Sequence, residues 1–128
     1  MSVCKIRPSI VLLTIVCFSL LIAATSATAD DDAKIDFNRD VKPILAKNCF
    51  ACHGPDGKAR EAELRLDTRL GATAKHENRQ AILAGQRGKS ELFRRIMSKD
   101  TDELMPPPDS GHRLTNAQKQ LLGRWIDS

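Results

Sequence analysis

The chain has 128 residues, which is enough for one domain of ordinary size. Its formal net charge is only +4, and no basic cluster with interleaved aromatic residues occurs, so the composition does not favour a nucleic-acid-binding protein. Four Phe, one Trp and no Tyr leave a thin core, and a small domain with such a core usually needs a disulfide, a metal or a cofactor.

Residues 1–29 have the pattern of a secretory signal peptide. A short basic stretch precedes an apolar run from Ile10 to Ala24, and Ala27-Thr28-Ala29 forms a small-x-small cleavage site before Asp30. An uncleaved anchor is the alternative, although the run is short for a membrane span. We therefore expect an exported protein in the periplasm or an equivalent extracytoplasmic space, which meets the membrane only during export and keeps a single domain at 30–128.

The first predicted helix covers about 38–48. Phe37, Val41, Ile44 and Leu45 fall on one helical face, and Pro43 lies either in the first turns or at a kink. Further along, Gly54-Pro55-Asp56-Gly57 is a strong turn signal, and a short helix is expected after Asp67 in a mostly polar stretch.

A second helix is predicted over about 90–98, with Ser90 as its N-cap. An apolar stripe at i, i+1, i+4 and i+5 follows the cap, formed by Leu92, Phe93, Ile96 and Met97. Beyond it, Met105-Pro106-Pro107-Pro108 predicts a stiff, extended loop, because proline fixes its own φ and disfavours helix in the residue before it.

The third and clearest helix covers 116–127. Thr115 and Gln118 have the spacing of a capping box, and an apolar face follows them with Leu121, Leu122, Trp125 and Ile126. No strand pattern is found along the chain. The predicted fold class is therefore all-α. Its short helices have too few aromatic side chains to fill a core by themselves.

The motif that carries chemistry is Cys49-Phe50-Ala51-Cys52-His53, the attachment signature of c-type haem. Two cysteines three residues apart lie on one side of a helical turn, so both sulfurs can add to the vinyl groups of one porphyrin. The next residue, His53, then supplies the proximal iron ligand. We expect one covalently attached haem c held by Cys49 and Cys52.

Other interpretations of the two cysteines are weaker. A thiol redox pair normally lies in a βαβ surround, which is not predicted here. A structural zinc site needs a fourth ligand, normally from a second Cys/His pair. A disulfide between residues three apart would connect nothing distant in the chain.

Four residues are candidates for the sixth iron ligand: Met97, Met105, His76 and His112. Met97 lies on an apolar stripe, where a methionine usually fills core space, and both histidines lie in polar stretches typical of exposed loops. Met105 is favoured because a proline-locked loop presents its thioether rigidly. Any of Arg60, Arg65, Arg69 and Arg113 can pair with the haem propionates, and the sequence does not select among them.

Six segments together resemble the planctomycete-type cytochrome c domain. They are Ile35–Leu45, Cys49–Gly54, Leu64–Thr68, Ser90–Leu92, Met105–Pro108 and Trp125–Ile126. The resemblance implies a small class I cytochrome c-like fold with terminal helices crossing beside the haem. It also implies Cys49 and Cys52 as attachment residues, His53 as proximal ligand and Met105 as distal ligand.

The sequence therefore predicts a monohaem electron carrier with iron axial ligands His53 and Met105. It has no catalytic residue set, so we expect no enzyme activity, and redox proteins are its expected partners for a monomeric domain. A haem-based redox or gas sensor, or the electron-entry module of a larger exported enzyme system, is the alternative. Domains of this family usually form the N-terminal part of much longer proteins, whereas this chain stops after the last predicted helix. The chain is therefore either a short cytochrome or a fragment of a longer protein.

Overall fold

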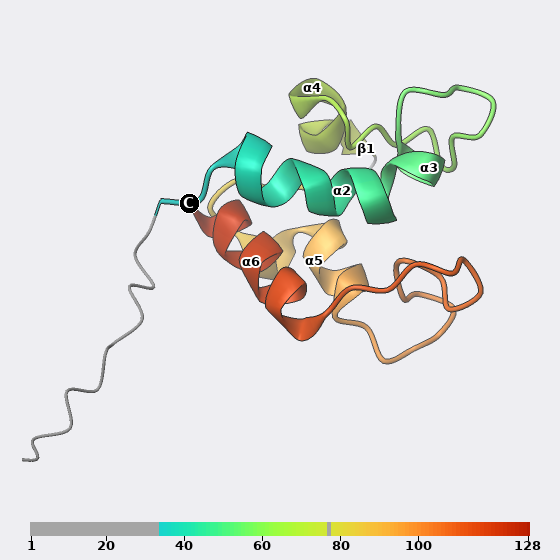
Figure 1. Cartoon of the computed structure of the whole chain (residues 1–128). Coiled ribbons are helices and arrows are strands. Elements are labelled where there is room, and N and C mark those ends of the chain that lie inside the picture. Colours follow the sequence, from blue (N-terminus) through green and yellow to red (C-terminus); the bar gives the residue numbers. More distant parts are fainter. Residues whose placement is uncertain (1–33, 77) are drawn as a thin grey trace, which may run out of the picture. The chain divides into compact units, whose positions relative to one another are not determined.

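Helices dominate the part of the chain that the computed structural model describes, residues 34–76 and 78–128. The predicted signal peptide and its cleavage site lie outside these residues, so both stay predictions. Figure 1 shows the helices and loops after residue 33. In chain order the elements are η1 (Phe37–Val41), α2 (Lys42–Asn48), α3 (Phe50–His53), α4 (Arg69–Thr73), β1 (Lys75–His76), β2 (Arg79–Gln80), η2 (Arg87–Lys89), α5 (Glu91–Ile96) and α6 (Asn116–Asp127).

The first helical segment changes type where proline enters it. Its opening turn, η1, is π-helical, and the Lys42 N–H donates to the carbonyl of Phe37, five residues back. Helix α2 then begins with Pro43 in its first turn. Proline has no N–H to donate to a carbonyl four residues earlier, so the change of hydrogen-bond register falls just before it. The single helix predicted over 38–48 is therefore two helical types joined end to end.

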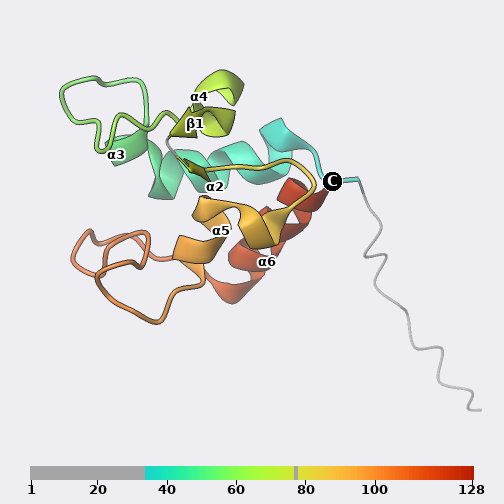
Figure 2. The ribbon, with the colours of Figure 1, turned by 180° about the vertical axis from the view of Figure 1, so that it is seen from behind.

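The last helix has the bounds and the cap expected from the sequence. The Gln118 N–H donates to Thr115 Oγ1 at 3.2 Å, and the Thr115 N–H donates to Gln118 Oε1 at 2.9 Å, so both halves of the capping box are present. Helix α6 packs on η1, where the Phe37 and Trp125 rings lie 5.5 Å apart and tilted by 36°. Seen from behind in Figure 2, α5 and α6 lie side by side.

Helix α5 is shorter than predicted and is not capped by the Ser90 side chain. It covers Glu91–Ile96 only, and Ser90 precedes it as a nearly fully buried residue. The Ser90 hydroxyl instead accepts a hydrogen bond from the Leu83 N–H at 2.9 Å and donates to the Gln86 carbonyl at 3.1 Å. The side chain thus ties the preceding loop to the start of the helix, which satisfies the loop's backbone in a buried position.

Among the described residues, ten buried hydrophobic side chains form the core. They are Val41, Leu45, Leu66, Ala72, Ala81, Ile82, Leu92, Ile96, Leu122 and Ile126. Helices α5 and α6 approach closely at Gly123, where an added Cβ would lie 2.6 Å from the Phe93 ring. The core thus lies between the helices.

A minimal hairpin corrects the expectation that no strand occurs. Strands β1 and β2 pair antiparallel, with Lys75 opposite Gln80 and His76 opposite Arg79. Strands of two residues are too short to produce the alternation of apolar and polar residues by which a strand is recognised in sequence. The class therefore remains helix-rich, with one small hairpin beside the functional site.

Candidate haem site

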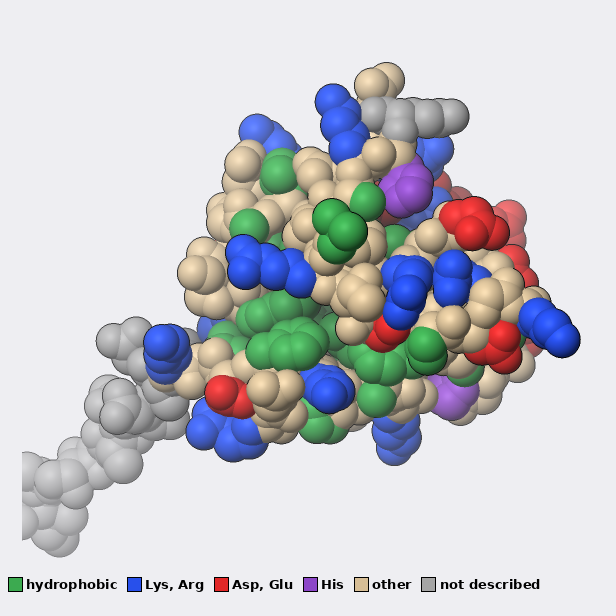
Figure 3. All heavy atoms as spheres, turned by 90° about the horizontal axis from the view of Figure 1, so that it is seen from above, with side chains coloured by type: hydrophobic (Ala, Val, Ile, Leu, Met, Phe, Trp, Pro, Cys, Tyr) green, Lys and Arg blue, Asp and Glu red, His purple; other side chains and the backbone are tan. Residues whose placement is uncertain are grey.

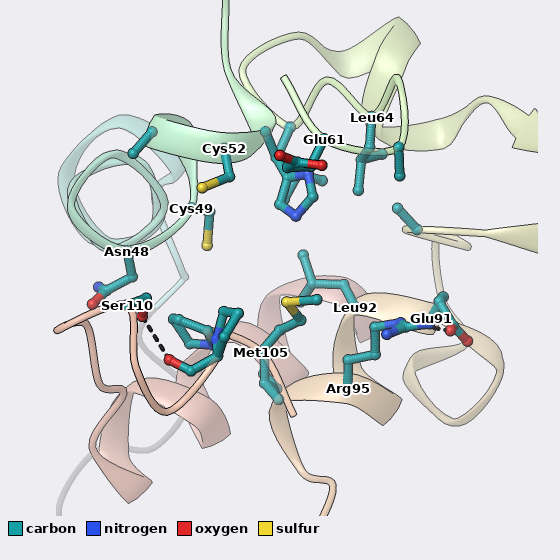
Figure 4. Close-up of a pocket in the computed structure, with 18 of the residues that line it drawn as sticks. Asn48, Cys49, Cys52, Glu61, Leu64, Glu91, Leu92, Arg95, Met105 and Ser110 are labelled. Atoms are coloured by element: carbon teal, nitrogen blue, oxygen red, sulfur yellow. Dashed lines mark hydrogen bonds and ion pairs between the residues drawn. The ribbon is translucent and has the colours of Figure 1, made fainter. Parts of the chain in front are cut away.

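A cavity of about 720 Å³ lies beside α3 and α5, and the loop that follows α5 closes part of it. Its volume falls within the range of about 300–1,000 Å³ that is typical of ligand pockets. Apolar side chains form much of its lining, among them Leu64, Leu66, Ala81, Leu92 and Ile96. Figure 4 shows Leu64 and Leu92 directed into this space from different elements.

The two cysteines lie on one short helical turn at one end of the cavity. Cys49 is the residue between α2 and α3, and its carbonyl accepts from the His53 N–H at 2.7 Å, which closes the turn. Both cysteines are free thiols that line the cavity, and Figure 4 shows their sulfurs close to each other on the same side. Burial and the neighbouring Cys52 raise the pKa of the Cys49 thiol to about 11, so that thiol is neutral at pH 7.

The last residue of the motif, His53, also lines the cavity. Its Nδ1 atom is buried without a hydrogen bond among the described residues. Burial lowers the pKa of the imidazole, and the nearby Glu61 backbone opposes this effect without forming a hydrogen bond of ordinary geometry. A neutral imidazole keeps the lone pair that binds a metal ion. His53 therefore has the charge state required of an iron ligand.

The loop after α3 holds this turn in place through its backbone. The Glu61 N–H donates to the Cys52 carbonyl, and the Leu66 N–H donates to the His53 carbonyl, each at 2.8 Å. These bonds satisfy carbonyls that a helix end otherwise leaves without partners. Gly54, the residue after His53, is required by packing, since an added Cβ would lie 2.2 Å from the Phe50 carbonyl oxygen.

Met105 lines the same cavity from another element. Its N–H donates to the Arg95 carbonyl at 3.3 Å, which fastens the Met-Pro loop to α5. Pro106 and Pro107, which follow it, also line the cavity. In Figure 4 the Met105 side chain is directed into the space that the sulfurs of the two cysteines also face. The structure thus brings Cys49, Cys52, His53 and Met105 around one cavity.

The other ligand candidates are placed differently from what the sequence suggested. The prediction that Met97 fills the core is wrong: it lies just beyond the end of α5, is 44% exposed and does not line the cavity. The apolar stripe that included it assumes a helix that continues past Ile96. His76 is exposed, as expected, whereas His112 is half-buried, and both line the cavity.

The charged residues of the cavity were missed in the sequence. None of the four arginines considered for the propionates lines it. Arg60 donates to the carbonyls of Gly54 and Pro55, and Arg65 pairs with Asp67. The charged residues that line it are Glu61, Arg79, Glu91 and Arg95. Glu91 and Arg95 share the cavity side of α5 with Leu92, a spacing that can be read from the sequence, but nothing in the sequence places Arg79 beside them.

The residues present fit a covalently attached haem: two free thiols on one turn, a neutral imidazole beside them, a thioether from another element and apolar walls. Within residues 34–76 and 78–128, no group of three or more His, Cys, Asp or Glu side chains is arranged to hold a metal ion directly. Fold and site together are those expected of a c-type cytochrome domain.

Comparison with known proteins agrees with this class. The family model described as planctomycete cytochrome C matches residues 49–109, from the first cysteine of the motif to just beyond the Met-Pro loop. The match confirms the family resemblance found in the sequence, and it points to a haem-binding electron-transfer domain of the cytochrome c type over these residues. Searches of curated proteins and of solved structures found no match.

Proposed function

We propose that this domain carries single electrons through one haem, attached covalently to Cys49 and Cys52, with His53 and Met105 as the two axial ligands of the iron. The observation that supports this assignment most strongly is that all four side chains line a single cavity, although Met105 is more than fifty residues from the motif. We extend the proposal to a small class I cytochrome c-like fold, for which the contact of η1 with α6 provides support.

When bound, the haem supplies an iron that alternates between the ferric and ferrous states. His53 donates a neutral imidazole from a turn fixed by the backbone of the following loop. Met105 donates a soft thioether, which favours the ferrous state and raises the reduction potential relative to a second histidine. Its loop is already ordered by prolines and by the bond to Arg95, so little conformational freedom is lost on ligation.

The apolar lining has a separate task, which is to keep water from the iron. Leu64, Leu66, Leu92 and Ile96 surround the cavity with hydrocarbon. A low-dielectric surround limits the reorganisation of solvent when the charge of the iron changes, and it disfavours the additional positive charge of the ferric state. The same side chains would gain burial against the porphyrin.

Electron exchange requires that part of the haem reach the surface. Cys52 is exposed whereas Cys49 is half-buried, which favours the edge near Cys52 as the contact point for redox partner proteins. On the face shown in Figure 3, basic and acidic side chains are both present, with hydrophobic side chains gathered between them. A surface of mixed charge with exposed hydrophobic side chains suits short-lived contacts with redox partner proteins. The domain would act as a monomer and transfer electrons without converting a substrate of its own.

We also propose that the protein works outside the cytoplasm after removal of residues 1–29. The haem motif and the signal pattern support each other, because a covalently attached haem is retained by an exported protein. Within the described part of the chain, no helix is long and apolar enough to cross a membrane.

The experiment is to produce the full chain in a host that attaches haem c, and to record its mass and optical spectrum in both oxidation states. We expect the mass of residues 30–128 plus one haem, and a six-coordinate low-spin iron in the ferric and the ferrous protein. A five-coordinate ferrous iron that binds carbon monoxide readily would instead favour the sensor. A mass without haem would overturn the proposal.

A further inference from the structure

The two ends of the cavity differ in chemistry. Figure 4 shows the sulfurs of Cys49 and Cys52 at one end, and Glu91 and Arg95 at the other. In haem, the vinyl groups that react with cysteine and the two propionates occupy largely opposite edges of the macrocycle. A porphyrin held by the two sulfurs therefore directs its propionates away from α3, toward the end that Glu91 and Arg95 line.

This far end carries a cluster of charges built on α5 and the hairpin. Glu91 Oε1 accepts from Arg95 Nε at 2.8 Å and from Arg94 Nη2 at 2.7 Å, and Arg79 Nη1 lies 3.9 Å from the same oxygen. Arg94 also pairs with Glu103. Three guanidinium groups thus face two carboxylates. The cluster has one positive charge in excess, which is the charge that one propionate would neutralise.

Arg95 is the member of this cluster best prepared to bind an anion. Its side chain is 28% exposed, and only its Nε is used in a hydrogen bond, which leaves both terminal guanidinium nitrogens without a partner among the described residues. Its carbonyl holds Met105, so its backbone position is fixed relative to the predicted iron ligand. Arg79, which forms no hydrogen bond with Glu91, lines the same end of the cavity.

We propose that Arg95, with Arg79 beside it, binds a haem propionate, and that Glu91 positions the Arg95 guanidinium for this contact. A guanidinium and a carboxylate pair in a fork-shaped geometry, and the two terminal nitrogens of Arg95 remain to be used in such a pair. This inference rests on the proposed function, since it requires a haem attached at Cys49 and Cys52. It also assigns the propionate to arginines other than Arg60, Arg65, Arg69 and Arg113.

The test is the ionisation of the propionates in the holo-protein. Haem labelled with ¹³C in the propionate carboxyls is incorporated, and their resonances in the diamagnetic ferrous state are followed against pH. The variants are Arg95→Gln, Arg95→Lys and, as a matched control, Arg94→Gln, which removes a partner of the same Glu91 that does not line the cavity. His76, Arg79 and Glu91 also face this end, and all three are retained in every variant.

Removal of a guanidinium near a carboxylate raises the pKa of that carboxylate by about one unit or more. We expect this rise for one propionate in Arg95→Gln, a smaller one in Arg95→Lys, and less than half of the Arg95→Gln shift in Arg94→Gln. Equal propionate pKa values in the wild type and both Arg95 variants, each with haem attached, would overturn the inference alone. If Arg95→Gln does not accumulate as holo-protein, the Lys variant decides. Failure of the wild type to attach haem would instead contradict the proposed function.

Discussion

The helical scaffold and the cavity wall of this protein differ in how they are stabilised. Elements η1, α2, α5 and α6 bury side chains against one another, with Val41, Leu45 and Leu122 fully excluded from solvent. The loops on the cavity side also bury side chains such as Leu66 and Ile82, but part of their hydrocarbon, including Leu64, faces a space of about 720 Å³. The comparison indicates that the scaffold is packed by the chain itself, whereas the loops need the haem as their core.

The largest effect is expected when the haem attachment is removed. With Cys49→Ala and Cys52→Ala combined, no thioether can form, and the cavity loops lose the surface on which they pack. Ordering costs about 1–2 kcal/mol per residue, and the side chains that the scaffold buries cannot offset this cost for the cavity loops as well. We expect loss of cooperative folding by circular dichroism. A cooperative, fully helical apo-protein would show that the scaffold is sufficient.

The next effect concerns the turn that joins the two regions. Gly54→Ala places a Cβ about 2.2 Å from the Phe50 carbonyl oxygen, which belongs to the rigid backbone of α3. Overpacking of this kind costs about 1–3 kcal/mol. We therefore expect a lower thermal midpoint for the holo-protein and a lower yield of attached haem. Gly88→Ala is the control, since nothing lies within 4 Å of the added Cβ, and it should leave both quantities unchanged.

A smaller effect, dependent on pH, is expected on the scaffold face of the cavity. Hydrogen bonds from Arg94, and then Arg95, lower the pKa of Glu91 from 4.5 to about 2 in the folded state. A lowered carboxyl pKa gives stability that is complete above pH 4.5 and is lost as pH falls toward 2. After allowance for solvent screening, Glu91→Gln should lower the free energy of unfolding by about 1–2 kcal/mol at pH 7.

The difference in the free energy of unfolding between Glu91→Gln and the wild type should disappear near pH 2, as measured by urea titrations of the holo-protein. Glu63→Gln is the control, because its side chain is 83% exposed and lies 3.9 Å from Arg60. If Glu91→Gln lowers the free energy of unfolding by the same amount at pH 7 and at pH 2, the ionisation of Glu91 contributes nothing to stability.

The same comparison explains which features could be predicted from the sequence. The haem motif and the capping box of α6 are local patterns, in which neighbouring residues carry the whole signal. Met97 was placed wrongly because periodicity does not reveal that α5 ends at Ile96. The grouping of Arg79 with Arg95 depends on the hairpin, whose two-residue strands leave no recognisable pattern. The cavity wall is therefore the region that needed the structure.

The central claim is that a thioether from the Met-Pro loop completes the iron, and the far-red sulfur-to-iron absorption of the ferric protein tests it most directly. Met105→Ala should keep covalent haem but lose this absorption, lower the reduction potential and open the iron to carbon monoxide. Met97→Ala is the matched control, since this exposed side chain should change stability by no more than about 0.5 kcal/mol and leave the spectrum unchanged. Loss of the absorption in Met97→Ala and its retention in Met105→Ala would contradict the account.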